Sequence, residues 1–150
     1  MGLDMYLSRK NYVKNWNFMA PSELHEITVK RGGEVRGDIK PERISYIVEQ
    51  VGYWRKANQI HNWFVENVQN GEDNCGEYYV SNEKLRELLN LCKSIKQEQL
   101  VPQEALPTQG GFFFGSTDYD EYYFQDIDDT IEILEPLVDV EGEYYYTSSW

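Results

Sequence analysis

The stretch PERISYIVEQVGYWRKANQIHNWFVENV, residues 41–68, decides the fold, because apolar residues recur along it at helical spacing in two separate phases. The first stripe is formed by Ile44, Ile47, Val48 and Val51. The second is formed by Ala57, Ile60, His61, Phe64 and Val68. Gly52 lies between the stripes, and glycine destabilises a helix interior. Pro41 suits a first helical turn. The stretch therefore predicts two helices, or one helix kinked near Gly52.

The second half of this stretch mixes aromatic rings with cations and hydrogen-bonding groups. These residues are Trp54, Arg55, Lys56, Asn58 and His61. Such side chains could line a pocket for an anionic, planar, nucleotide-like ligand. The alternative is a core helix, in which the tryptophans pack and the long cationic chains extend to solvent.

The remaining segments carry local signals for further elements. Period-two alternation predicts a strand at 3–13, and short strands are also expected at 77–81 and 143–147. Gly32-Gly33 predicts a hairpin turn. The aromatic run 112–114 predicts a buried strand.

Two further helices are expected on the C-terminal side of residue 80. Ser81 is placed to cap a helix whose apolar stripe is Leu85, Leu88, Leu89, Cys92 and Ile95. Asp118 with Glu121 resembles a capping box for a helix that Pro136 should end. The inner face of this helix is expected to be Tyr123, Ile127, Thr130, Ile131 and Leu134.

Length and charge divide the chain unevenly. The 150 residues predict a single domain spanning 1–150. The net charge is −12, yet all 14 Lys and Arg lie at or before Lys96, and 13 acidic residues follow it. Residues 97–150 therefore form an acidic, tyrosine-rich third that suits a basic partner and disfavours direct nucleic-acid binding. The alternative is that these charges serve solubility.

Cysteine usage and hydropathy indicate a cytoplasmic protein. Cys75 and Cys92 show no paired spacing, which argues against a disulfide scaffold or a zinc site. The N-terminus lacks a signal-peptide pattern and no segment is apolar enough to span a bilayer, so no membrane association is expected.

Motifs for metals, cofactors and catalysis are missing from the sequence. The acidic stretch 118–129 has Tyr123 and Asp129 where a calcium loop needs Gly and Glu. There is no P-loop, nucleophile elbow or paired metal-type histidine. No cofactor, metal site or catalytic residue is predicted. A small hydrolase, with His61, Arg55 and a carboxylate of the C-terminal helix, is the weakest alternative.

The acidic, tyrosine-rich segment is the expected partner-binding surface, because Tyr side chains dominate binding hot spots. The candidate residues are Asp118, Tyr119, Asp120, Glu121, Tyr122, Asp128 and Asp129. The alternative is that most of these tyrosines cover the core with their hydroxyls in water.

Three blocks of the chain resemble a family of small proteins encoded by phages and prophages. They are GLDMYL at 2–7, GYWRKANQIHNWFVENVQ at 52–69 and LPTQGGFFFGSTDYDEYY at 106–123. The resemblance brings no catalytic residue with it. It implies an accessory protein that counters host defence or redirects a host enzyme by binding.

Together these observations predict an α+β fold, with three or four helices packed on a small, mainly antiparallel sheet made from the N-terminal, Phe112 and C-terminal segments. The leading hypothesis is a non-enzymatic phage protein that binds and inhibits a basic host protein, such as a CRISPR nuclease or another defence nuclease. A nucleotide-sequestering module is the second hypothesis. The oligomeric state stays open, with a homodimer as one option.

Overall fold

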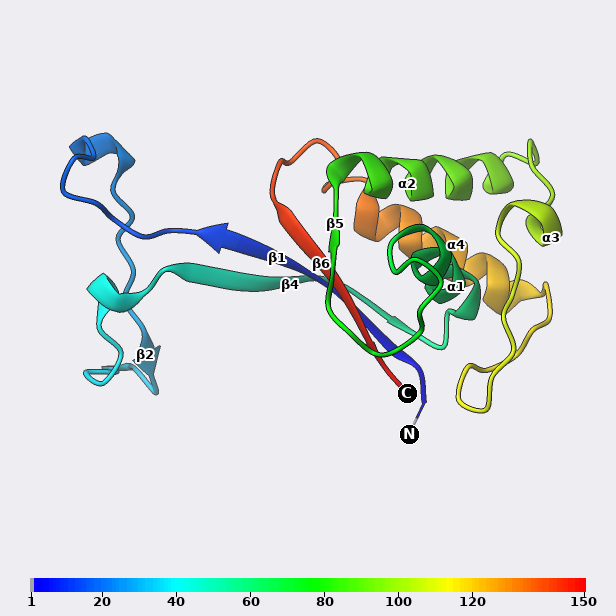
Figure 1. The fold of residues 1–150 in the computed structure, drawn as a ribbon, viewed down its shortest axis with the longest axis horizontal. Helices are drawn as coiled ribbons and strands as arrows, with labels where there is room; N and C mark the ends of the chain where they lie inside the picture. Colours follow the sequence, from blue (N-terminus) through cyan, green and yellow to red (C-terminus); the bar gives the residue numbers. More distant parts are fainter. Residues whose placement is uncertain (1) are drawn as a thin grey trace.

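The computed structural model describes residues 2–150 and confirms an α+β fold with a mainly antiparallel sheet (Figure 1). The larger sheet has the order β4-β1-β6-β5, and a separate pair is formed by β2 and β3. The strands are β1 (Asp4–Tyr12), β2 (Lys30–Arg31), β3 (Glu34–Val35), β4 (Tyr46–Arg55), β5 (Tyr78–Val80) and β6 (Glu143–Ser149). The helices are α1 (Asn58–Asn67), α2 (Asn82–Lys96), α3 (Pro102–Ala105) and α4 (Glu121–Leu134), with 3₁₀ turns η1 (Pro21–Glu23) and η2 (Pro41–Arg43).

The predicted strands at the two ends of the chain are confirmed, and so is the alternation predicted for the first of them. Leu3, Met5 and Leu7 are fully buried at the start of β1, while the residues between them are partly exposed. On β6, Tyr144 and Tyr146 point into the same core. Because β1 pairs antiparallel with β6, the two termini lie side by side (Figure 1).

The prediction of helix over the first half of residues 41–68 is wrong. This half is the strand β4, and nine of its residues are paired with β1. Val48 is 58% exposed and Ile47 is also exposed, so the apparent helical stripe is not a buried face. β-branched residues favour strands, and pairing with β1 satisfies the backbone there. Pro41 opens the short turn η2 instead of a helix.

Gly52 is not a hinge but a site of close packing between sheet and helix. A Cβ at this position would lie 2.8 Å from Cγ2 of Ile133 on α4 and 3.3 Å from Cβ of Leu7. A side chain there would push α4 off the sheet. The register of β1 against β4 also shifts between Leu7 and Ser8. Glycine within a strand often marks such an irregularity.

The helical predictions elsewhere are confirmed. The second half of residues 41–68 forms α1, with Ile60, His61 and Phe64 buried. In α2 the hydroxyl of Ser81 accepts from the backbone N–H of Lys84, and the whole predicted stripe through Cys92 is buried.

The last predicted helix, α4, buries the expected face except for Ile131, which is partly buried, and its cap lies two residues further on. Asp120, not Asp118, accepts from the N–H groups of Tyr122 and Tyr123. The helix ends before Pro136, as predicted.

The prediction of a buried strand at residues 112–114 is wrong. These residues form a turn in a loop, and Phe112 is 93% exposed while Phe114 is buried. Glycine flanks the run on both sides. A Cβ at Gly111 would lie 2.8 Å from Cγ of Phe114, so only glycine lets this ring fold back over the loop. The loop is attached to the sheet by one bond, from the N–H of Leu3 to the carbonyl oxygen of Phe113.

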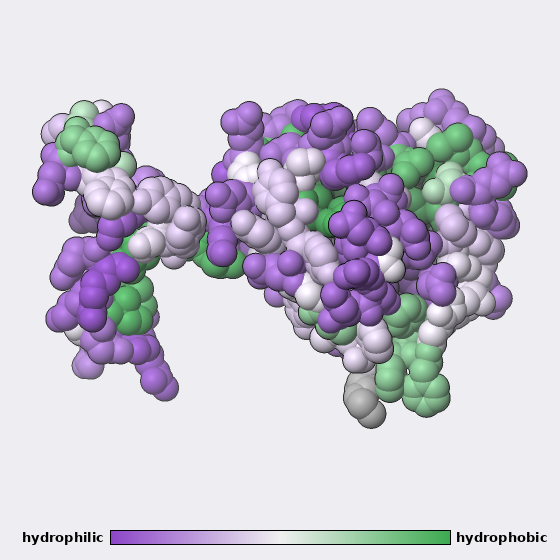
Figure 2. All heavy atoms as spheres, viewed as in Figure 1, coloured by the Kyte–Doolittle hydropathy of each residue, from purple (hydrophilic) through white to green (hydrophobic). Residues whose placement is uncertain are grey.

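The molecule has a compact body and a projecting arm (Figure 1). The helices and most of the sheet form the body, whereas the far ends of β1 and β4 extend away from it. At the tip, residues 14–45 form a small lobe that contains the confirmed Gly32-Gly33 hairpin. None of these residues is buried. Figure 2 shows apolar patches on the lobe, which stands clear of the body.

Candidate functional site

A hydrogen-bonded chain of three polar side chains, two of them buried, lies beside one of the cavities. His61 projects from α1 and is fully buried. Its Nδ1 lies 2.6 Å from the hydroxyl of Tyr146 on β6, and its Nε2 lies 3.0 Å from Oδ2 of Asp73. Asp73 comes from the loop between α1 and β5, so the cluster joins three separate parts of the chain.

The hydrogen bonds assign the protons in this cluster. Burial raises the pKa of Tyr146 well above its usual value, so this hydroxyl stays protonated. His61 is its hydrogen-bond partner among the described residues, so the hydroxyl donates to Nδ1. Nε2 of His61 therefore carries its proton and donates to the carboxylate of Asp73. In this arrangement the hydrogen bonds run from Tyr146 through His61 to the carboxylate of Asp73.

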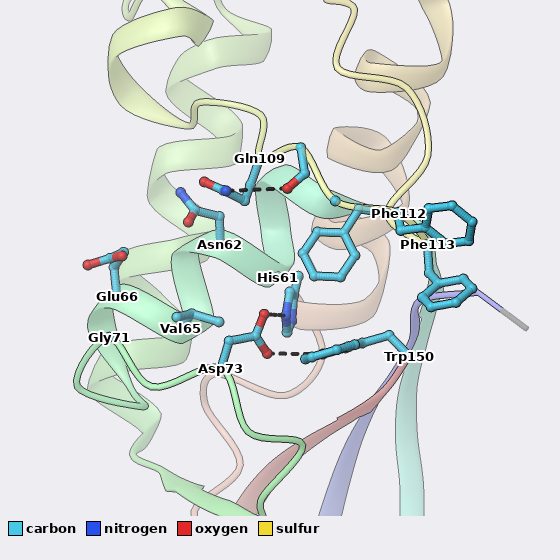
Figure 3. Close-up of a pocket in the computed structure, with 13 residues that line it drawn as sticks. His61, Asn62, Val65, Glu66, Gly71, Asp73, Gln109, Phe112, Phe113 and Trp150 are labelled. Atoms are coloured by element: carbon cyan, nitrogen blue, oxygen red, sulfur yellow. Dashed lines mark hydrogen bonds and ion pairs between the residues drawn. The ribbon is translucent and has the colours of Figure 1, made fainter.

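Asp73 presents its charge to solvent at the edge of the cavity. Its second oxygen, Oδ1, accepts from the indole N–H of Trp150 at 3.1 Å. Its side chain is 27% exposed. Figure 3 shows the carboxylate between the rings of His61 and Trp150, with both bonds drawn. Held from two sides, the carboxylate keeps one orientation.

The cavity has a volume of about 480 Å³. One wall is the part of α1 from His61 to Glu66, and the opposite wall is the loop 109–114 with its three phenylalanines. Phe114 meets His61 edge to face, with centroids 5.3 Å apart, and also packs against Trp150. The volume lies within the range of small-ligand sites.

Asn58 holds the loop wall in place. Its side-chain amide donates to the carbonyl oxygens of Phe114 and Ser116, at 3.0 and 2.8 Å. Its carbonyl oxygen accepts from the N–H of Gln109 at 2.9 Å. This buried residue therefore serves the loop and is not free to meet a ligand.

The other residues of the predicted nucleotide-like site do not converge on His61. Trp54 is buried and its indole N–H donates to the hydroxyl of Thr130 at 2.9 Å. Arg55 is exposed and pairs with Asp4 at 3.0 Å. Of the five predicted residues, His61 alone lines this cavity.

Arg55 and Lys56 line a second, smaller hollow of about 300 Å³. Three carboxylates, Asp118, Asp120 and Asp126, share that hollow. Burial raises the pKa of Asp126 to about 6. Because the acids outnumber the cations, this hollow is poorly matched to a phosphate group.

Part of the predicted partner surface is engaged within the fold. Asp120 caps α4, and Asp128 pairs with Lys96 at 2.6 Å. Asp129 accepts from Gln125, and the hydroxyl of Tyr119 accepts from the N–H of Thr108. These four side chains lie at the surface only in part.

The rest of this surface is open to solvent. Asp118 and Glu121 are exposed, and Tyr122 is 71% exposed at the start of α4. Phe124 and Glu132 are exposed further along the same helix. The structure thus brings carboxylates and aromatic rings together on the outer side of α4.

Sequence reasoning missed Asp73, Tyr146 and Trp150 as neighbours of His61. Tyr146 lies 85 positions from His61 and Asp73 lies in a loop with no motif, so no local spacing links them. The usable signal was the period-two alternation of β6, which places Tyr146 on the inner face of the strand.

Comparison with known proteins leaves the chain without an assigned family. No family model matches it, and no curated protein or solved structure matches it either. Within residues 2–150, no helix has the length and apolarity needed to cross a membrane. No group of three potential metal ligands gathers in the described part of the chain.

Proposed function

We propose that the protein is a non-enzymatic binding protein that inhibits a basic partner protein by occupying a positively charged surface with the outer face of α4. The observation that carries the proposal is the exposed pairing of Asp118 and Glu121 with Tyr122 at the start of this helix. Exposed aromatic rings supply contact area, and unpaired carboxylates supply attraction and a faster encounter.

The charge distribution supports this reading. On the side of α4 that faces α2, Asp128 forms an ion pair with Lys96 of α2. Glu135 forms one with Lys93. Asp118, Glu121 and Glu132 have no ion-pair partner among residues 2–150. Glu121 and Glu132 leave the outer side of the helix negative, and Asp118 lies exposed just before its first turn.

The phage-like blocks narrow the proposal to a host target. A defence nuclease fits the electrostatics, because nucleic-acid-binding surfaces are basic. In this role the acidic face would cover the surface on which the nuclease binds its substrate.

The alternatives draw less support from the geometry. Arg55 and Lys56, the cations expected to hold a nucleotide, lie outside the cavity beside His61. A hydrolase that uses a hydroxyl or thiol nucleophile is disfavoured, because the described residues lining the cavity include no Ser, Thr or Cys.

The test is capture from a bacterial lysate by the tagged protein, with Asp118→Lys/Glu121→Lys as the charge-reversed variant. Glu26→Lys/Glu42→Lys, on the exposed lobe, carries the same change in net charge and is the matched control. We expect a protein held by wild type and control, lost with the α4 variant and released at about 0.5 M salt. The captured protein should lose activity when wild type is added. Equal capture by the α4 variant would refute the proposal.

A further inference from the structure

The cavity beside His61 is lined by both carboxylates and aromatic rings. One end holds a carboxylate with a fixed orientation, and the walls are aromatic rings. Asp73 and Glu66 are both acidic, and no Lys or Arg of residues 2–150 is among the lining groups. The two carboxylates that line the cavity therefore face no Lys or Arg counter-charge there.

The carboxylate of Asp73 can accept further hydrogen bonds from a ligand. His61 and Trp150 each use one acceptor position of a different carboxylate oxygen. A carboxylate oxygen has two lone pairs, so each oxygen keeps one position for a further donor. Tyr146, behind His61, fixes the histidine tautomer that donates to Asp73. This hydrogen-bonded relay thus holds the carboxylate of Asp73 in one orientation at the edge of the cavity.

The aromatic walls are placed beside this charge. Trp150 is 47% exposed and contacts Asp73 through its indole N–H, so part of the ring remains available. Phe112 and Phe113 stand at the opening, with ring centroids 4.7 Å apart. Aromatic faces attract organic cations and pack on the apolar parts that such ions carry.

We propose that this cavity binds an organic cation, a guanidinium or alkylammonium group, with the charge on Asp73 and the apolar part against Trp150 and the phenylalanines of the 112–114 turn. The ligand chemistry follows from the lining alone and does not depend on the face of α4. An anion would meet two carboxylates and no counter-charge. A neutral apolar group would leave the exposed carboxylate partly desolvated without a partner.

The cation can be a free small molecule or a side chain of a protein. Agmatine represents the free source, and the peptide acetyl-Gly-Arg-Gly-amide represents the side chain of a partner. Citrulline amide is the neutral control, because it keeps the shape of arginine amide without its charge. Inorganic phosphate and AMP are the anionic controls.

The readout is the indole N–H resonance of Trp150 in ¹H–¹⁵N spectra of the full chain. Trp150→Phe assigns this peak among the four tryptophans. We expect a saturable shift with agmatine or the peptide and none with the control compounds. Tighter binding of agmatine would indicate a free amine, and tighter binding of the peptide a partner side chain.

Asp73→Asn keeps the shape of the side chain and removes its charge. It should weaken cation binding by about tenfold or more. Glu26→Gln, on the exposed lobe, removes the same charge elsewhere and should leave the affinity unchanged. Glu66→Gln, which leaves the hydrogen-bonded relay untouched, should weaken binding less than Asp73→Asn and serves if that variant does not fold.

Three results would overturn the inference. The first is no saturable shift with any cation, and the second is an equal shift with citrulline amide. The third is a shift with phosphate or AMP, which would restore the nucleotide-like ligand. Failure of this test leaves the proposed function of the α4 face intact, since the charge-reversed variant there does not touch the cavity.

Discussion

Asp126 is the carboxyl group whose environment most changes its chemistry. It lies on the inner side of α4, where Nε2 of Gln59 approaches its Oδ2 at 3.3 Å. Burial raises its pKa from 3.8 to about 6, and the nearby charges of Asp129 and Asp120 act in the same direction. The folded state therefore binds this proton more tightly than the unfolded state.

Ionised Asp126 therefore lowers the free energy of unfolding at neutral pH, and a neutral residue at this position would remove that destabilisation. A raised folded-state pKa stabilises the fold when the pH is below about 4, and this contribution is lost as the pH rises through 6. Asp126→Asn should therefore increase the free energy of unfolding at pH 7.5 by about 1–2 kcal/mol. The difference should shrink towards pH 4, as measured by urea denaturation at several pH values.

Asp139→Asn is the matched control, because the side chain of Asp139 is 89% exposed. Its effect should stay within about 0.5 kcal/mol at every pH. Destabilisation by Asp126→Asn at pH 7.5 would mean that the charged form of this carboxyl supports the fold.

Among the elements, the loop 109–116 depends most on a single side chain. The side chain of Asn58, at the first turn of α1, makes the three hydrogen bonds that attach this loop to the helix. Asn58→Ala should lower the free energy of unfolding by about 2–3 kcal/mol, because buried partners lose their bonds. Amide hydrogen exchange in residues 109–116 should accelerate more than in α2.

Asn67→Ala, at the other end of α1, provides the comparison. The side-chain amide of Asn67 donates to the carbonyl oxygen of Trp63 but holds no distant loop. A loss below about 1 kcal/mol is expected, with unchanged exchange in the loop. Unchanged loop exchange in Asn58→Ala would show that the phenylalanines, and not this amide, fix the cavity wall.

At the scale of the element, local signals found α2 and missed β4. The α2 sequence combines a capping serine with five apolar residues on one face, and both features act within the helix itself. In β4, Ile47, Val48 and Val51 match helical spacing and strand propensity equally. The choice was made by pairing with β1, some 40 positions away in sequence.

At the scale of the whole molecule, the lobe at the tip of the arm adds exposed surface without adding to the buried core. Residues 14–45 include no buried side chain, and the N–H of Val13 donates to the carbonyl oxygen of Ser45 at the base of the lobe. Replacing residues 14–44 by Asn-Gly would join the strands through a two-residue turn. The free energy of unfolding in urea should change by less than about 1 kcal/mol.

The shortened protein should also keep the Trp150 resonance shift, because the cavity lies beside the chain termini and away from the lobe (Figures 1 and 3). A shortened chain that unfolds would indicate that the lobe supports the sheet through contacts along the arm. A folded chain that no longer captures a partner would assign the exposed rings of the lobe to binding.

The sequence by itself determined the fold class, the end strands, the hairpin, α2, the inner face of α4 and the concentration of negative charge after Lys96. These features follow from residues close together in the chain, whose propensity, periodicity and caps act locally. Tertiary structure alone decided that residues 46–55 form a strand, that residues 112–114 form a turn, and that His61 meets Asp73 and Tyr146. Strand pairing and a buried hydrogen-bonded cluster depend on partners brought together only by folding, and no local pattern of residues records them.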